Sequence, residues 1–397
     1  MIMKDVVLVD GVRTPIGRMG SSLASLRVED LSTVVMKEVI NKTGLDPAQF
    51  GDVIWGMALK TGTALSLARW AALKAGVPVE VPATTIERQC ISGLQALIFA
   101  DQAIKAGSMD LALVGGAESW SALPYFYSKL PTAYSLTPPL PIPPEPAPDE
   151  YNVIMGLTGE NLVEKYGISR EEQDEFALRS HQKAVKAIDD GIMAEEIVPV
   201  PVFTRKGPAP VDTDECPRRE TSLETLAKLP PVFKRGGTIT AGNASGLNDG
   251  ACALIVASAE KAARLGLKPL TRVVASAVVG VDPRIMGIGP AWATPKVLAL
   301  TGLSFEDLDV IECNEAFACQ NLAVIKELKN QGLEVDMAKW NPNGGAVALG
   351  HPNAMSGARL ALTVSRELVR RRKRYGLVTI CAGGGMGVAT IFENVQL

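Results

Sequence analysis

The sequence CISGLQALIFADQAIKAGSMDLALVGG occupies residues 90–116 and contains the pattern from which the fold can be predicted. Apolar residues recur with helical spacing over Leu94–Ile104, directly after Ser92-Gly93. A short apolar run, Leu111–Val114, follows and is closed by Gly115-Gly116, as is typical of a buried strand. This stretch therefore predicts a helix that leads into a strand.

The same order recurs near the C-terminus, in SGARLALTVSRELVRRRKRYGLVTICAGGG at residues 356–385. Here Ser356-Gly357 precedes a helix predicted over Ala358–Arg370, and the apolar run Leu377–Ile380 is followed by glycines. We interpret the two stretches as copies of one α/β unit.

Shorter segments extend the alternation of strands and helices. Apolar runs predict strands at Val6–Val9, Val53–Trp55, Val273–Val279 and Val310-Ile311, and helical spacing covers Leu31–Ile40 and Ala64–Ala75. This alternation is typical of an α/β fold with a largely parallel sheet.

The region 119–248 differs from both halves. Seven prolines in Pro138–Pro148 favour extended, irregular chain. Ser169 and Glu172 then form a capping-box pattern, which predicts a helix continuing to about Ile188. We expect a loop-rich insertion here.

Length and composition limit the function classes. A chain of 397 residues suggests two or three domains, and its formal net charge of −3 provides no overall basic surface for nucleic acid. Lys4 and Asp5 interrupt the N-terminal apolar residues, and no run of 18 apolar residues occurs. We therefore expect a cytoplasmic protein that neither enters a membrane nor binds nucleic acid.

The chain has six cysteines and two histidines, and their spacing matches no structural zinc motif. Scattered cysteines in a long chain favour a reducing compartment over a disulfide framework. His351 lies between Gly350 and Pro352, so it is either a catalytic loop residue or a simple turn residue. His181 falls within the predicted helix and is interpreted as a packed, structural histidine.

Three further residues have both a chemical and a structural interpretation. Cys90 stands at a predicted helix start, where the helix dipole would lower its pKa to about 7 at best, but it could equally be a buried packing residue. Cys381 precedes glycines that form either an anion-binding nest or a tight turn. Asn314 follows a strand and either faces a ligand or caps a helix.

Taken together, these segments resemble the thiolase family over essentially the whole chain, from Arg13-Thr14-Pro15 onward. The matching motifs appear in the family's order and are Cys90-Ile91-Ser92-Gly93, Gly242–Gly250, Asn314-Glu315-Ala316-Phe317, Gly350-His351-Pro352 with Ser356-Gly357, and Cys381–Gly385.

The resemblance implies a catalytic assignment. Cys90 would take the acyl group as a thioester, activated by His351, and Cys381 would exchange a proton with the α-carbon of acetyl-CoA. Asn314 would hold a water that, with His351, stabilises the enolate-like thioester oxygen. The backbone N–H groups of Cys90 and Gly383 would form a second oxyanion hole.

The resemblance also implies an architecture. Two α/β halves with five-stranded mixed sheets would stack in an αβαβα arrangement, one from 1–118 completed by about 249–269 and the other from 270–397. A loop domain, 119–248, would bind CoA. In or near it, Arg218 and Thr225 match nucleotide-end positions, Ser245 matches a pantetheine position, and Met155 and Phe317 match the acyl pocket.

A local positive patch would compensate for the net charge when CoA binds. Its expected members are Arg218, Arg219, Lys228, Lys234 and Arg235, although the same residues could form only a solvated basic face. The implied protein is a homodimer or homotetramer that uses acyl-CoA, acetyl-CoA and CoA as substrates, with no metal and no permanently bound cofactor.

Some positions depart from the family pattern, and two alternatives stay open. Ile91, Ile154 and the run Asn353-Ala354-Met355 replace usual residues, the last replacing an apolar-Gly-small run. The leading hypothesis is an acetyl-CoA C-acyltransferase or C-acetyltransferase. A decarboxylating ketoacyl synthase and a non-catalytic acyl-CoA-binding protein are the alternatives.

Overall fold

A computed structural model describes residues 4–124, 147–204 and 207–397. Nearly all of the proline-dense stretch Pro138–Pro148 lies outside the described residues, so its expected irregular structure is not tested. Within the described ranges, none of the helices is long and apolar enough to cross a membrane.

The strands and helices follow the predicted alternation. The strands are β1 (Val6–Arg13), β2 (Gly17–Arg18), β3 (Asp52–Gly56), β4 (Ala83–Ile86), β5 (Leu111–Ser119), β6 (Val200–Thr204), β7 (Gly207–Val211), β8 (Asn248–Ser258), β9 (Thr271–Gly280), β10 (Leu308–Cys313), β11 (Tyr375–Ala382) and β12 (Met386–Asn394). The α-helices are α1 (Val28–Thr43), α2 (Leu67–Lys74), α3 (Ser92–Lys105), α4 (Met155–Tyr166), α5 (Arg170–Asp189), α6 (Leu223–Ala227), α7 (Ala259–Arg264), α8 (Gly289–Thr301), α9 (Ala318–Asn330), α10 (Ala346–Leu349) and α11 (Asn353–Arg371). Short 3₁₀ helices are η1 (Pro47–Gln49), η2 (Gln89–Ile91), η3 (Met193–Glu195) and η4 (Pro283–Ile288).

The strands form two groups that correspond to the two halves. The first has the order β1-β8-β5-β3-β4, in which β3 is parallel to both of its neighbours and β8 is antiparallel to both of its own. The second has the order β10-β11-β12-β9, in which β10 and β11 are parallel and the other pairs are antiparallel. The mixed α/β character is therefore confirmed, whereas the prediction of a largely parallel sheet is wrong, because most of the strand pairs in the large sheet are antiparallel.

Two details of the predicted sheets are corrected. The groups are joined into one path, because Val7 and Leu8 of β1 pair with Arg272 and Thr271 of β9. Among the described residues, the second group has four strands rather than five. Trp340 makes an isolated parallel bridge to Ile311 at the position where a fifth strand would lie.

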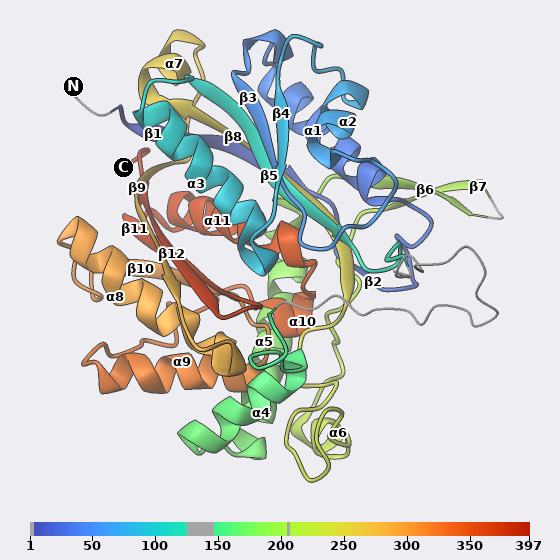
Figure 1. Ribbon diagram of the computed structural model, residues 1–397, viewed down its shortest axis with the longest axis vertical. Helices are drawn as coiled ribbons and strands as arrows, with labels where there is room; N and C mark the ends of the chain where they lie inside the picture. Colours follow the sequence, from blue (N-terminus) through green and yellow to red (C-terminus); the bar gives the residue numbers. More distant parts are fainter. Residues whose placement is uncertain (1–3, 125–146, 205–206) are drawn as a thin grey trace.

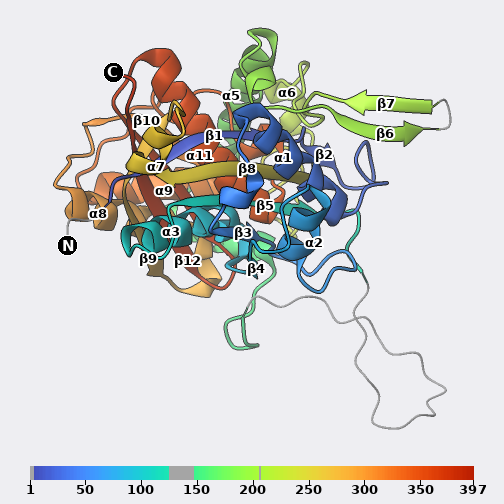
Figure 2. The same ribbon diagram turned by 90° about the horizontal axis from the view of Figure 1, so that it is seen from above.

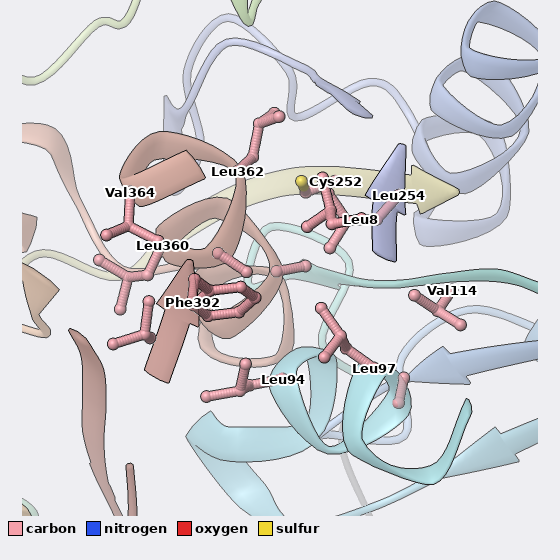
Figure 3. Packing of buried hydrophobic residues seen from close by; sticks show 14 of the residues in the cluster. Leu8, Leu94, Leu97, Val114, Cys252, Leu254, Leu360, Leu362, Val364 and Phe392 are labelled. Carbon is pink, nitrogen blue, oxygen red and sulfur yellow. The ribbon is translucent and has the colours of Figure 1, made fainter. Parts of the chain in front are cut away.

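Alternation along each strand divides the core into layers, since successive side chains point to opposite faces. Val6 and Leu8 of β1 face the central cluster with α3 and α11, whereas Val7 and Val9 face the outer cluster under α1 and α2. A third cluster packs α8 and α9 against the second group of strands. Figure 1 shows this order, with α3 and α11 between the two groups of strands, and Figure 3 shows the central packing around Leu94, Leu254, Leu360 and Phe392.

Glycines allow the two central helices to approach each other. A Cβ added to Gly93 would lie 2.3 Å from the Ala354 carbonyl oxygen, and one on Gly357 would lie 2.7 Å from the Leu94 backbone nitrogen. The repeated Ser-Gly pattern thus serves close packing of α3 against α11. The α11 helix begins at Asn353, five residues before the predicted start at Ala358.

The expected end of one strand is also wrong. Gly115-Gly116 does not close β5, which continues to Ser119. A Cβ on Gly116 would lie 2.2 Å from the Ala354 carbonyl oxygen, so the glycine serves the close approach of α11 rather than a turn.

The region between the halves contains α4, α5, α6 and the β6–β7 hairpin, which projects from the body of the molecule in Figure 2. The predicted capping box at the start of α5 is confirmed, because Ser169 Oγ accepts from the Glu172 N–H and Glu172 Oε2 accepts from the Ser169 N–H. Buried ion pairs attach this region to β1. The fully buried Arg13 binds Asp214 through two nitrogens, at 2.7 and 2.8 Å, and Glu196 at 3.1 Å.

Candidate active site

Cys90 lies in η2, immediately before α3, on a sharply bent segment of chain. Gln89 has a φ of 45°, which is a strained value for a residue with a side chain. The Cys90 sulfur accepts a hydrogen bond from Asn353 Nδ2 at 3.3 Å. The prediction that the pKa of Cys90 is lowered is wrong, because the sum of all contributions raises it. Burial raises the pKa above its ordinary value, while hydrogen bonds from Asn353 and from the Gly383 and Cys90 backbone N–H groups act against burial.

His351 is buried on the segment between α10 and α11, and its ring has two distinct contacts. Nδ1 lies 2.6 Å from Ser356 Oγ, and Ser356 Oγ also lies 3.3 Å from the Pro352 carbonyl oxygen, to which only a hydroxyl can donate. With the hydroxyl directed there, Oγ accepts from Nδ1–H, and Nε2 keeps its lone pair. Burial, with a smaller effect of Arg359, lowers the pKa of His351 to about 4, so the ring is neutral near pH 7.

Asn314 follows β10 and is held by its backbone. Its N–H donates to the Thr379 carbonyl oxygen at 3.0 Å, and its own carbonyl oxygen accepts from Asn321 Nδ2 at 3.1 Å. The side-chain Nδ2 lies 3.5 Å from His351 Nε2, at the long limit of a hydrogen bond. Oδ1 is buried and has no hydrogen-bond partner among the described residues. Asn314 therefore retains an acceptor that a ligand or water could use.

Cys381 lies near the end of β11 and is 1% exposed. Burial raises its pKa, and the neighbouring Cys90 raises it further. The glycines that follow reverse the chain into β12, and Gly385 has a φ of 81° where a Cβ would lie 2.2 Å from the Val281 carbonyl oxygen. This turn brings the Gly383 N–H to the Cys90 sulfur. The glycine run is thus both a tight turn and a source of backbone donors.

Four separate segments of the chain therefore bring their side chains into one region. These side chains are Cys90, Cys381, Asn314 and His351. Asn353, two residues beyond His351, contacts the Cys90 sulfur and so connects the histidine segment to the thiol. The thiols can supply a nucleophile and a proton donor, and the neutral imidazole can supply a base. Within the described ranges, no three His, Cys, Asp or Glu side chains are grouped so that they could hold a metal ion.

Arg218 lies at a hollow on the side of the loop-rich region. A cavity of about 410 Å³ is lined by residues including His181, Arg218 and Arg219. A smaller one of about 70 Å³ is lined by Arg218 together with Gly246 and Gly350, next to His351. The Arg218 backbone N–H donates to His181 Nδ1 at 3.1 Å, while its guanidinium has no partner in the described part of the chain. His181 is packed on α5, as predicted.

The other predicted CoA-binding residues have different surroundings. Thr225 is exposed, and its hydroxyl is used in the N-terminal cap of α6 with Ser222. Ser245 is half-buried, and its N–H donates to the Ala316 carbonyl oxygen at 3.0 Å. Neither residue lines the two hollows that Arg218 lines.

Phe317 and Met155 belong to the same apolar cluster, where Phe317 is 7% exposed and Met155 is partly buried. Phe317 also makes an edge-to-face contact with Phe233, with ring centroids 6.1 Å apart. The two residues predicted for the acyl pocket therefore belong to one apolar cluster, to which α4 and the start of α9 contribute.

The predicted basic patch is partly neutralised. Arg219 makes two contacts with Asp189, at 2.6 and 2.9 Å, and Lys234 is paired with Glu164. These two residues therefore contribute less free positive charge than expected.

Two residues beside Cys90 were missed by reasoning from the sequence. Asn353 stands out there as a departure from the family pattern, without a role, and nothing in the sequence marks Trp120. Trp120 Nε1 donates to Asn353 Oδ1 at 2.7 Å. The available signal for Asn353 was a polar residue in a position that the family pattern makes apolar. Trp120 gave no such signal, because its partner Asn353 is 233 residues away in the chain.

Comparisons with known proteins cover nearly the whole chain. The models for the thiolase N-terminal domain and the thiolase C-terminal domain match residues 6–260 and 267–394. A 3-oxoadipyl-CoA/3-oxo-5,6-dehydrosuberyl-CoA thiolase of Escherichia coli (strain K12) is 49% identical, covering 99% of this chain and all of the relative. An acetyl-CoA acetyltransferase of Pseudomonas aeruginosa is 47% identical, covering 98% of each chain. Among solved structures, the acetyl-CoA acetyltransferase from Syntrophomonas wolfei has a TM-score of 0.95 at 41% identity, covering 99% of this chain and 100% of that one. Human mitochondrial 3-ketoacyl-CoA thiolase has a TM-score of 0.93 at 39% identity, with both chains fully covered.

Proposed function

The chain belongs to the thiolase family, and on that premise we propose that it transfers acyl groups between CoA thioesters through an S-acyl intermediate on Cys90. The observation that carries this proposal is the convergence of two thiols, a neutral imidazole and an Asn314 oxygen that has no partner in the described part of the chain. The overall reaction is acyl-CoA plus acetyl-CoA giving CoA plus 3-oxoacyl-CoA, and it is reversible.

In the first half-reaction, the Cys90 sulfur attacks the thioester carbonyl and its proton passes to His351 Nε2. The bond from the carbonyl carbon to the CoA sulfur breaks, and Cys381 gives its proton to the departing CoA thiolate. The raised pKa of Cys381 supports this role, because a thiol that is protonated at rest has a proton to give. The N–H groups of Cys90 and Gly383 would stabilise the oxyanion, at about 2.7–4 kcal/mol for one such donor.

In the second half-reaction, the Cys381 thiolate takes an α-proton from acetyl-CoA. The resulting carbanion attacks the acyl carbon, a carbon–carbon bond forms, and the Cys90 sulfur leaves and recovers its proton from His351. Asn314, through a bound water and with His351, would stabilise the enolate-like oxygen of acetyl-CoA. All protons are returned, so the site is ready for another cycle and the kinetics are ping-pong.

The names of the relatives also bear on the acyl group that the enzyme transfers. The relatives carry the names acetyl-CoA acetyltransferase and 3-oxoadipyl-CoA thiolase, which suggests either a short acyl group or one ending in a carboxylate. We propose an acetyl-CoA C-acyltransferase or C-acetyltransferase, with Met155 and Phe317 beside the acyl chain. Turnover of a 3-oxoacyl-CoA series that includes acetoacetyl-CoA and 3-oxoadipyl-CoA would separate these possibilities.

Arg218, Thr225 and Ser245 are proposed to contact CoA. The strongest support among them is the Arg218 guanidinium, which lines a cavity and has no partner among the residues that the structure describes. We also propose that the chain has three domains. They are an N-terminal half formed by residues 1–118 and completed by about 249–269, a CoA-binding loop domain at 119–248, and a C-terminal half at 270–397. The same proposal includes a cytoplasmic homodimer or homotetramer that needs no metal or permanently bound cofactor.

Intact mass spectrometry after incubation with acetyl-CoA or acetoacetyl-CoA tests the nucleophile. We expect an acyl adduct that is absent in Cys90→Ala and retained in Cys252→Ala, because Cys252 is fully buried in the core. The absence of any adduct, with CoA still bound, would favour a non-catalytic binding protein. Turnover of a malonyl thioester but not of acetyl-CoA would favour a ketoacyl synthase instead.

A further inference from the structure

Asn353 connects the Cys90 sulfur to the indole of Trp120. Its Nδ2 lies 3.3 Å from Cys90 Sγ, and its Oδ1 lies 2.7 Å from Trp120 Nε1. Asn353 is the first residue of α11, and Trp120 directly follows β5. Three separate parts of the chain are therefore connected through Asn353.

The orientation of the Asn353 amide follows from hydrogen-bonding chemistry. An indole N–H can only donate, so the amide oxygen must face Trp120. The amide nitrogen, which can only donate, is then the atom that faces the sulfur. A donor directed at sulfur interacts more strongly with a thiolate than with a thiol, because hydrogen bonds to charged groups are the stronger ones.

The contact depends on a polar residue at position 353, directly after His351-Pro352. An apolar side chain there would offer the sulfur no donor. Trp120 is half-buried beside it and gives the amide a fixed direction.

We propose that Asn353, oriented by Trp120, is a third donor to the Cys90 thiolate, additional to the backbone N–H groups, and that it makes Cys90 more reactive near neutral pH. This inference rests on the proposed role of Cys90 as the nucleophile. Asn353 contacts the reacting sulfur directly, whereas Trp120 is a positioning residue that acts through it.

Other charged and titratable groups act on the same sulfur or lie on the segments of chain beside it. Burial raises the pKa of Cys90, and Glu118 on β5 raises it further when its carboxyl group is ionised; Cys381 approaches from β11. Glu87 is bound to the N–H of Gln89, the residue before Cys90, and His351 precedes α11 by two residues. Because these groups remain in an Asn353 variant, a change in the Cys90 titration can be assigned to the amide.

The test is the rate of iodoacetamide labelling as a function of pH, with peptide mapping to separate Cys90 from Cys381. Asn353→Leu preserves approximate size and removes the donor. We expect the midpoint for Cys90 to rise by about one pH unit, so that labelling at pH 7 falls roughly tenfold. Trp120→Phe should shift the midpoint in the same direction by a smaller amount, because it removes the partner that orients the amide.

Trp55→Phe is the matched control. The buried Trp55 indole also donates to a side-chain oxygen, that of Ser32, but it lies in the outer cluster under α1 and α2. Its loss should leave the Cys90 midpoint unchanged. An accompanying fall in kcat/KM at pH 7 that disappears at high pH, where every variant is ionised, would support the proposal further.

The outcomes distinguish the two proposals. An unchanged midpoint in folded Asn353→Leu would overturn the role of Asn353, and if that variant does not fold, an unchanged midpoint in Trp120→Phe would do the same. By contrast, wild-type protein that forms no acyl adduct on Cys90 contradicts the proposed function, whatever the Asn353 variants do.

Discussion

Asn314 Nδ2 and His351 Nε2 lie 3.5 Å apart, although 37 residues separate them in the chain. The contact places an amide donor beside the ring nitrogen that keeps its lone pair, since Nδ1 is occupied by Ser356. Burial of the ring disfavours its protonated form. His351 is therefore available as a base over a wider pH range than an exposed imidazole.

The acid limb of activity should reflect the buried imidazole. Because burial lowers the pKa of His351 to about 4, kcat/KM should stay nearly constant from pH 7 to pH 5 and decline only close to pH 4. His351→Asn should lose roughly 10²–10⁴-fold in rate. Initial rates at each pH, with circular dichroism showing that the protein is folded, provide the measurement. A midpoint near the ordinary histidine value would contradict this account.

The two thiols that are proposed to be catalytic, Cys90 and Cys381, should be separable by mutation. Cys381→Ala should reduce carbon–carbon bond formation by roughly 10²–10⁴-fold, since the α-proton loses its acceptor. The acyl adduct on Cys90 should still form, because a CoA thiolate is a good leaving group even without a proton donor. Quenched-flow assays of condensation and intact mass measure the two steps. Cys252→Ala should match wild type in both, and loss of the adduct in Cys381→Ala would rule out the division of roles.

Two adjacent arginines should differ in their effect on CoA. The Arg218 guanidinium is unpaired among the described residues, whereas Arg219 is held by Asp189. Arg218→Ala should raise KM for CoA about fivefold and leave kcat nearly unchanged, with a weaker effect at high salt. Arg219→Ala should change KM less. Steady-state kinetics at two ionic strengths test this, and equal effects of the two variants would count against a specific role for Arg218.

His181 should contribute to acid instability. Burial lowers the pKa of His181 to about 4, so the unfolded state binds more protons than the folded state between about pH 6.5 and 4. The stability that the neutral ring contributes is present above pH 6.5 and is lost as the pH falls to about 4, by roughly 3 kcal/mol. His181→Gln should remove this part of the pH dependence.

Urea unfolding of wild type and His181→Gln at pH 7 and pH 4.5 measures that difference. The comparison between proteins is needed because Glu118 and Glu312, whose pKa values burial raises to about 8, act in the opposite direction. These two carboxyl groups are present in both proteins and cancel. Parallel pH dependences for wild type and variant would show that His181 does not titrate as expected.

Removing Arg13 alone from its buried ion pairs should lower the free energy of unfolding considerably. Arg13→Met would leave Asp214 and Glu196 as buried carboxylates without their partner, which typically costs about 3–5 kcal/mol. Arg13→Met combined with Glu196→Gln and Asp214→Asn should recover much of the loss. Arg284→Met, which removes an exposed pair with Asp282, should leave stability close to wild type. Urea midpoints measure all three, and an additive loss in the triple variant would contradict the electrostatic explanation.

Patterns in the sequence predicted helices and strands well where residues close together in the chain determine the element. The helical spacing of Leu94–Ile104 anticipated α3, and the Ser169–Glu172 capping box anticipated the start of α5. Patterns failed where a residue responds to a distant neighbour. Gly115-Gly116 indicated a strand end, yet β5 pairs with β8 as far as Ser119, and Gly116 is needed for the close approach of α11.

The same division applies to the site. Residue types and the order of the motifs were enough to identify which thiols, imidazole and amide could do chemistry, because both are properties of short stretches of chain. The packing of the layers was needed to establish that burial raises the pKa of Cys90, that Arg219 is neutralised by Asp189, and that Asn353 donates to the Cys90 sulfur. Desolvation and hydrogen bonds between segments depend on how distant parts of the chain meet, and Asn353 is 263 residues from Cys90 in the chain.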